Sequence, residues 1–142
     1  MSKIVMVCSR TPRDLGFELE TFLQTLAPDN LPGDHVVTTD GRGLHLGVYR
    51  PHKPVENQTA YVGWLRGPGH GSCALFKGGD TIELAADAAA SRTIWIAVTD
   101  ELFVASTVQR AVPWFLRPFE LDTRAIAWML ASGSIGPGIS WD

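Results

Sequence analysis

Short strands joined by tight turns fill the second half of this sequence, and they constrain its fold more than any other feature. Apolar runs begin at Cys73, Thr81, Thr93 and Leu102, and only a few turn residues separate each run from the next. Strands at such spacing pair most naturally in an antiparallel arrangement. The second half therefore predicts an antiparallel sheet.

The first half predicts further strands and a helix. Strands are expected at residues 4–9, 35–39, 44–49 and 60–65, with a hairpin turn at residues 40–43. Asp14 is suited to cap a helix whose apolar face comprises Leu15, Leu19, Phe22, Leu23 and Leu26. A last helix is expected after Asp122, with Ile126, Met129 and Leu130 on one face. The sum is an α+β fold with two layers of antiparallel sheet and helices packed outside them.

Length and charge indicate the broad class of protein. A chain of 142 residues is expected to form one domain, residues 1–133, followed by the start of a linker, residues 134–142. The net charge of −3, without a run of Lys or Arg, argues against a nucleic-acid partner. No apolar run reaches membrane-spanning length, so no membrane association is expected. Cys8 and Cys73 lie in apolar runs and are interpreted as reduced residues of a cytoplasmic protein.

Neither a metal site nor a phosphate loop is predicted. The four histidines, His35, His45, His52 and His70, lack the spacing of metal ligands on one helix face. Residues 67–71 are rich in glycine, but they lack the Lys-Ser/Thr pair of a phosphate-binding loop. This segment is therefore interpreted as a turn.

The order of motifs after Gly71 resembles a known family. A Gly71-Ser72-Cys73-Ala74 strand precedes a hairpin that ends in Asp87, and Phe103-Val104-Ala105-Ser106 ends a later strand. This order is similar to that of the glutaminase-type N-terminal domain of asparagine synthetase and its relatives, which include the β-lactam and lasso-peptide macrolactam synthetases. The resemblance implies the αββα sandwich of the N-terminal-nucleophile hydrolases.

The catalytic residues of that family are not matched here. The family uses a cysteine directly after the initiator Met as nucleophile, with its own α-amine as base, whereas this chain has Ser2 followed by Lys3. An oxyanion-binding Asn expected near Gly63 is also missing. Arg50 and Asp87 match the positions that hold the carboxylate and amine of glutamine. The resemblance therefore implies a degenerate, non-catalytic domain.

Other functions stay open at this point. Ser2 could act as the N-terminal nucleophile of an active glutaminase after removal of Met1, and Cys8 could do so after cleavage of seven residues. Arg50 and Asp87 could instead bind an amino-acid-like ligand in a stand-alone module. More ordinary roles are an ion pair for Arg50 and a turn cap for Asp87.

A synthetase domain, in cis or in trans, is the partner that the resemblance implies. ATP and Mg²⁺ are expected only on that domain, because these residues contain no Ser-Gly-Gly-x-Asp-Ser motif, and no cofactor is expected on this chain. Trp114 and Trp141 are interpreted as interface residues, with packing on their own domain as the alternative, and Trp95 and Trp128 as core residues. A homo-oligomer also stays open.

Overall fold

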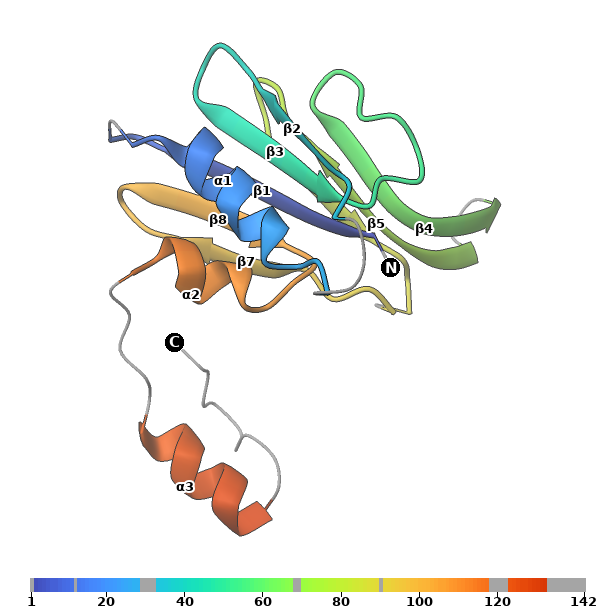
Figure 1. The fold of residues 1–142 in the computed structure, drawn as a ribbon. Coiled ribbons are helices and arrows are strands. Elements are labelled where there is room, and N and C mark those ends of the chain that lie inside the picture. Colours follow the sequence, from blue (N-terminus) through green and yellow to red (C-terminus); the bar gives the residue numbers. More distant parts are fainter. Residues whose placement is uncertain are drawn as a thin grey trace.

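A computed structural model describes residues 2–11, 13–28, 33–67, 70–89, 91–117 and 123–132. Its strands are β1 (Lys3–Ser9), β2 (His35–Thr39), β3 (Leu44–Tyr49), β4 (Thr59–Gly67), β5 (His70–Lys77), β6 (Glu83–Ala86), β7 (Trp95–Val98) and β8 (Leu102–Ser106). Its helices are α1 (Leu15–Gln24), α2 (Ala111–Phe115) and α3 (Thr123–Ser132). Figure 1 shows their arrangement.

The larger sheet has five strands in the order β2-β3-β1-β8-β7, and β1 lies at its centre. The four neighbouring strand pairs of this sheet are antiparallel, and Val5 lies opposite Gly47 on one side and Ser106 on the other. The side chains from Ile4 to Val7 are completely buried. A run of four buried apolar residues fits a strand that is covered on both faces.

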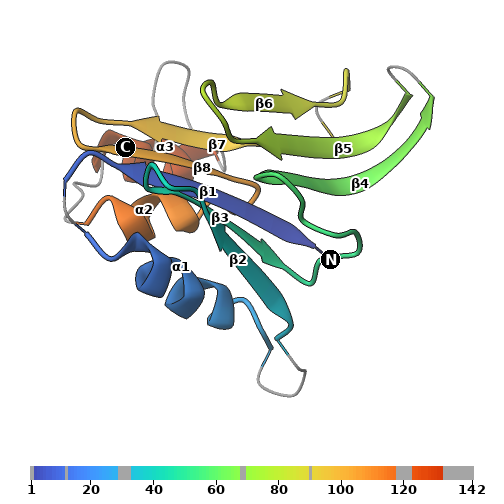
Figure 2. The same ribbon diagram turned by 90° about the horizontal axis from the view of Figure 1, so that it is seen from above.

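Helices α1 and α2 cover one face of this sheet (Figure 2). The first helix begins where the carboxylate of Asp14 accepts a hydrogen bond from the backbone N–H of Phe17 at 3.1 Å. Its apolar face packs on the sheet through Leu15, Leu19, Phe22 and Leu23. On the other side of this core, β1 contributes Val5 and Val7.

The smaller sheet, in the order β4-β5-β6, packs against the opposite face of the five-stranded sheet. Ile4 and Met6 of β1 point into this second core, where they meet Val62 and Phe76. Successive residues of β1 thus serve alternate cores, as the pleat of a strand requires. The result is three layers: helices, the five-stranded sheet and the three-stranded sheet.

The expected α+β class, with two antiparallel sheets, is confirmed. The αββα sandwich requires helices outside both sheets, and this finer arrangement is not confirmed, because α1 and α2 both contact the five-stranded sheet. The face of α3 that was expected to pack is exposed, with Leu130 85% and Ile126 41% accessible. Trp95 was expected in the core, but it lies on the edge strand β7 and is 36% exposed. An apolar strand pattern does not distinguish an edge strand from a central one.

Two further findings concern the class of the protein. Cys8 and Cys73 are both free thiols. Among the described residues, no helix has the length and apolar character needed to cross a bilayer.

Candidate functional site

Ser2 lies immediately before β1, at the end of the molecule where residues of both sheets surround a pocket of about 460 Å³. Besides Ser2, the pocket is lined by Lys3 and Trp95 of the five-stranded sheet and by Ser72 of the three-stranded sheet. The connection that leads into β7 adds Arg92. This pocket is called the Ser2 pocket below.

The hydroxyl of Ser2 makes two contacts. It donates a hydrogen bond to the backbone carbonyl of Arg50 at 2.6 Å, and it lies 2.9 Å from Nδ1 of His52. The other ring nitrogen of His52, Nε2, lies 3.3 Å from the carbonyl oxygen of Gly63. A serine, an exposed histidine and a carbonyl therefore form a chain beside the pocket.

Counting protons shows which hydrogen bonds Ser2 and His52 can make at the same time. A serine hydroxyl has one proton, and a neutral imidazole has one N–H. The contacts Ser2–Arg50, Ser2–His52 and His52–Gly63 can all be hydrogen bonds when both ring nitrogens of His52 carry protons. With His52 neutral and its Nε2–H directed to Gly63, Nδ1 can accept the proton of Ser2 only if the bond to Arg50 is given up. In this structure the Ser2 hydroxyl therefore donates its proton to the carbonyl of Arg50 and not to a base.

Asp87 is buried, and both oxygens of its carboxylate accept hydrogen bonds. It accepts hydrogen bonds from the Ser91 N–H at 3.1 Å, the Ser91 hydroxyl at 2.8 Å and the Cys73 N–H at 3.1 Å. The bonds from Ser91, assisted by the one from Cys73, lower the pKa of Asp87 to about 2. Asp87 therefore caps the turn that ends at Ser91, and both of its carboxylate oxygens already accept hydrogen bonds from the chain.

A polar chain connects Asp87 to the Ser2 pocket. The Ser91 hydroxyl lies 2.8 Å from the Ser72 hydroxyl, and Nε of Arg92 donates to the Ser72 hydroxyl at 3.3 Å. Arg92 and Ser72 both line the pocket. Among the described residues that line the Ser2 pocket, the arginine is therefore Arg92.

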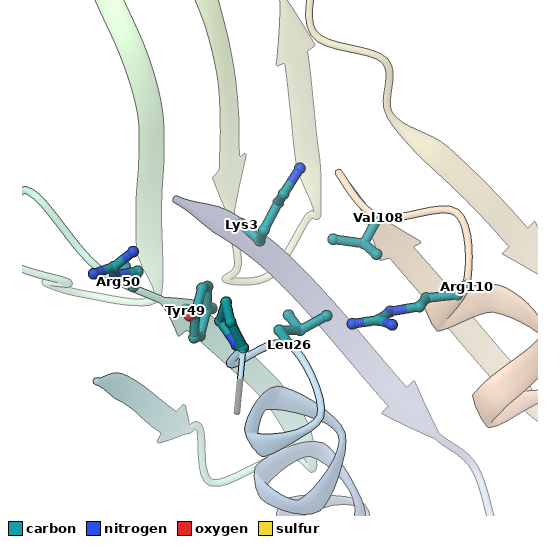
Figure 3. Close-up of a pocket in the computed structure, with 7 residues that line it drawn as sticks. Lys3, Leu26, Tyr49, Arg50, Val108 and Arg110 are labelled. Atoms are coloured by element: carbon teal, nitrogen blue, oxygen red, sulfur yellow. The ribbon is translucent and has the colours of Figure 1, made fainter. Parts of the chain in front are cut away.

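Arg50 lies at a different pocket. This second pocket, of about 380 Å³, is lined by Lys3, Leu26, Pro28, Tyr49, Arg50, Val108 and Arg110 (Figure 3). Ser72 and Ser91, the neighbours of Asp87, line the Ser2 pocket instead. The structure thus does not bring Arg50 and Asp87 together around one ligand.

Trp114, Trp141 and Cys8 complete the set of expected site residues. Trp114 packs on Phe22, with ring centroids 5.4 Å apart, and is partly buried against its own core. Trp141 lies outside the described residues. Cys8 is part of β1 and pairs with Leu44, and burial raises the pKa of its thiol. Cleavage before Cys8 would remove most of the central strand.

Comparison with known proteins gave no match, whether to family models, to curated proteins or to solved structures. Within the described ranges, no group of three His, Cys, Asp or Glu side chains is arranged to hold a metal ion.

Sequence reasoning missed His52, Arg92, Tyr49 and Arg110. No local motif marks any of them, because each acquires its role from residues far away in the chain. Ser2 and His52, for example, are 50 positions apart.

Proposed function

We propose that this chain is a degenerate glutaminase-like domain of an asparagine synthetase-related protein. It does not hydrolyse glutamine, and it serves as the structural partner of an ATP-dependent domain that forms amides or lactams. The observation that carries the proposal is the location of Ser2, which precedes the central strand of one sheet and borders a pocket shared with the second sheet. In N-terminal-nucleophile hydrolases, whose sandwich the sequence resembles, the first residue of the chain is the nucleophile.

The chemistry around Ser2 supports the loss of activity. Its hydroxyl donates to the Arg50 carbonyl, so its oxygen is not activated by a base. Stabilisation of an oxyanion needs N–H donors aimed at the reacting carbonyl, whereas Gly63 presents its own carbonyl oxygen to His52. The resemblance assigns Arg50 to the substrate carboxylate, but substrate binding alone cannot cleave an amide without a nucleophile and an oxyanion hole.

Exposed apolar side chains on α3 support a partner domain. Leu130 and Ile126 are exposed on this helix, although its sequence pattern predicts a buried face. Apolar surface of this kind is typical of an interface with another domain. We therefore place the synthetase partner, in cis or in trans, next to the C-terminal part of this chain.

The test of lost activity is glutamate release from glutamine by the purified chain, with Ser2→Ala as the control. Both proteins are expected to show the same background rate. A diazo-ketone analogue of glutamine, which traps an N-terminal nucleophile covalently, is expected to leave the intact mass unchanged. Turnover that disappears in Ser2→Ala, or a covalent adduct on Ser2, would refute the proposal.

The partner is tested with the genetic context and then with protein. A nucleotide-binding synthetase segment in the same reading frame or a neighbouring gene is expected, and it should co-purify with this chain. Leu130→Glu should weaken that association, whereas Lys77→Glu on β5 should not. A context without such a segment would contradict this half of the proposal.

A second candidate is an active hydrolase that uses Ser2, and the 2.9 Å contact between Ser2 and His52 favours it. If His52 acts as base, glutamate release should be lost in both Ser2→Ala and His52→Gln. If instead the α-amine of Ser2 is the base, His52→Gln should keep most of the activity.

A further inference from the structure

Three basic residues and a buried tyrosine line the pocket that contains Arg50. Lys3 and Tyr49 face each other on paired strands β1 and β3, and Arg110 reaches the pocket from the segment before α2. Figure 3 shows these side chains around the beginning of β1, with Arg50 beside Tyr49 on one side and Arg110 on the other. No acidic side chain is among the described residues that line the pocket.

The hydroxyl of Tyr49 is the unusual feature of this pocket. Tyr49 is only 4% exposed, and its hydroxyl has no hydrogen-bond partner among the described residues. A buried polar group without a partner costs free energy, and Phe would fill the same space without that cost. The hydroxyl is therefore explained best by a partner other than the described residues of the chain.

The arginines have donors to spare. Arg110 uses one N–H to reach the carbonyl of Thr25 at the end of α1, at 2.9 Å, which leaves four of its five donors. No carboxylate of the described residues forms an ion pair with Arg50 or Arg110. Guanidinium groups with free donors suit carboxylate or phosphate oxygens because they bind them through two parallel hydrogen bonds.

The backbone at Arg50 is held in a conformation that sets the direction of its side chain. Its φ angle is +50°, which is uncommon for a residue other than glycine. Two hydrogen bonds fix this conformation: the Arg50 N–H donates to the Asp34 carbonyl at 2.7 Å, and the Arg50 carbonyl accepts from Ser2. These bonds fix the backbone from which the Arg50 side chain extends at this pocket.

Size and lining indicate what the ligand carries besides its charge. A volume of about 380 Å³ lies within the range of small-molecule sites, which begins at roughly 300 Å³. Leu26, Pro28 and Val108 form an apolar part of the lining. An inorganic ion alone would leave this part uncovered, so an organic anion fits better.

We propose that this pocket binds a small organic oxyanion, a carboxylate or a phosphomonoester with an apolar group. Arg50 and Arg110 bind the oxyanion, the Tyr49 hydroxyl donates to it, and Leu26, Pro28 and Val108 contact the apolar group. Lys3 adds positive charge at the rim. This site differs from the Ser2 pocket, although Lys3 lines both, and the inference does not depend on the function proposed above.

Calorimetric titration with phenyl phosphate, phenylacetate and inorganic phosphate at constant ionic strength tests the proposal. Saturable binding of phenyl phosphate or phenylacetate is expected, and inorganic phosphate should bind more weakly. The stronger of the two organic probes identifies the oxyanion. Absence of saturable binding for both organic probes up to about 10 mM, above the range of even weak specific sites, would overturn the proposal.

Variants locate the binding. Arg50→Gln and Arg110→Gln should each weaken binding by roughly tenfold or more, as the loss of a charged hydrogen bond does. Arg42→Gln is the matched control, because it removes the same charge from an exposed turn where Arg42 pairs with Asp80. Equal weakening in all three variants would show a general ionic effect and would refute the site.

Tyr49→Phe gives the most specific result, since it removes only the hydroxyl. Affinity for the organic probe should fall by about tenfold while the circular dichroism spectrum stays the same. If Arg110→Gln fails to fold because the bond to Thr25 is lost, Tyr49→Phe and Arg50→Gln still decide the outcome. Unchanged affinity in Tyr49→Phe would contradict the proposed role of the hydroxyl.

Discussion

The two pockets near the start of β1 differ in how their polar groups are satisfied. Around the Ser2 pocket, Asp87, Ser91, Ser72 and Arg92 bond to one another in a continuous chain. In the pocket of Arg50, the Tyr49 hydroxyl is buried without a partner among the described residues. Polar groups that bond to each other hold a structure together, whereas polar groups left over are available to a ligand. The first pocket therefore has the character of a structural junction, and the second that of a binding site.

The largest expected effect comes from Gly63→Ala, which disrupts the structural junction at the Ser2 pocket. Gly63 has a φ angle of +106°, and a Cβ at this position would lie 1.9 Å from the Ser72 carbonyl oxygen. Gly63→Ala must therefore push β4 away from β5, next to the polar chain that Ser72 belongs to. We expect a loss of about 3 kcal/mol or more in the free energy of unfolding, measured with urea.

A suitable control is Gly41→Ala, because a Cβ there meets nothing within 4 Å. That variant should change the free energy of unfolding by less than about 0.5 kcal/mol. A loss of similar size in both variants would show that the close contact between Gly63 and Ser72 is not the cause.

The second prediction concerns the pH dependence of the junction. The pKa of Asp87 is lowered from 3.8 to about 2 in the folded chain, because Ser91 and Cys73 donate to the ionised carboxylate. Stability from this group is therefore fully present above about pH 4 and is lost as the pH falls through about 2. Urea unfolding between pH 5 and pH 2 should show wild type losing stability relative to Asp87→Asn.

Asn cannot change its charge, so the difference between the two proteins isolates Asp87 from the other carboxylates. A constant difference across the whole pH range would mean that the folded pKa of Asp87 is not lowered. The polar chain beside the Ser2 pocket would then be weaker than its geometry indicates.

The third prediction concerns the Ser2 hydroxyl. Ser2→Ala removes the partly buried bond to the Arg50 carbonyl and the exposed contact with His52. We expect a loss of about 1 kcal/mol in the free energy of unfolding, the usual net value of one hydrogen bond. A Ser2→Ala variant as stable as wild type would show that Ser2 does not take part in the junction.

Local features of the fold could be predicted from the sequence. The cap at Asp14 and the buried face of α1 follow from residue spacing within one helix, and the hairpin between β2 and β3 follows from the turn at residues 40–43. In contrast, the division of strands between two sheets depends on distant partners. β6 and β7 are neighbours in sequence but belong to different sheets, and β1 pairs with β8 from the other end of the domain.

The candidate sites depended still more on distant contacts. Ser2 and Asp87 were predicted one by one, but the sequence did not indicate that Arg92 would border the Ser2 pocket or that Arg50 would lie elsewhere. Tyr49 is an ordinary aromatic strand residue by sequence. Only the three-dimensional packing shows that its hydroxyl is buried without a partner among the described residues.

The smallest expected effect is the counterpart of Ser2→Ala, because it removes a hydroxyl from the other pocket. Tyr49→Phe keeps the aromatic ring in the core and deletes a group that is bonded to nothing in the described part of the chain. Without ligand, the free energy of unfolding should stay the same or rise by up to about 1 kcal/mol, since no hydrogen bond is lost and a desolvated group is removed.

With phenyl phosphate present, wild type should gain more stability than Tyr49→Phe, because a ligand that binds only the folded state stabilises it more when its affinity is higher. If Tyr49→Phe is more stable than wild type without ligand but less stable with phenyl phosphate, the hydroxyl serves ligand binding and not the fold. A loss of about 1 kcal/mol without ligand, as expected for Ser2→Ala, would instead mean that Tyr49 is bonded within the folded chain, and the contrast between the two pockets would no longer hold.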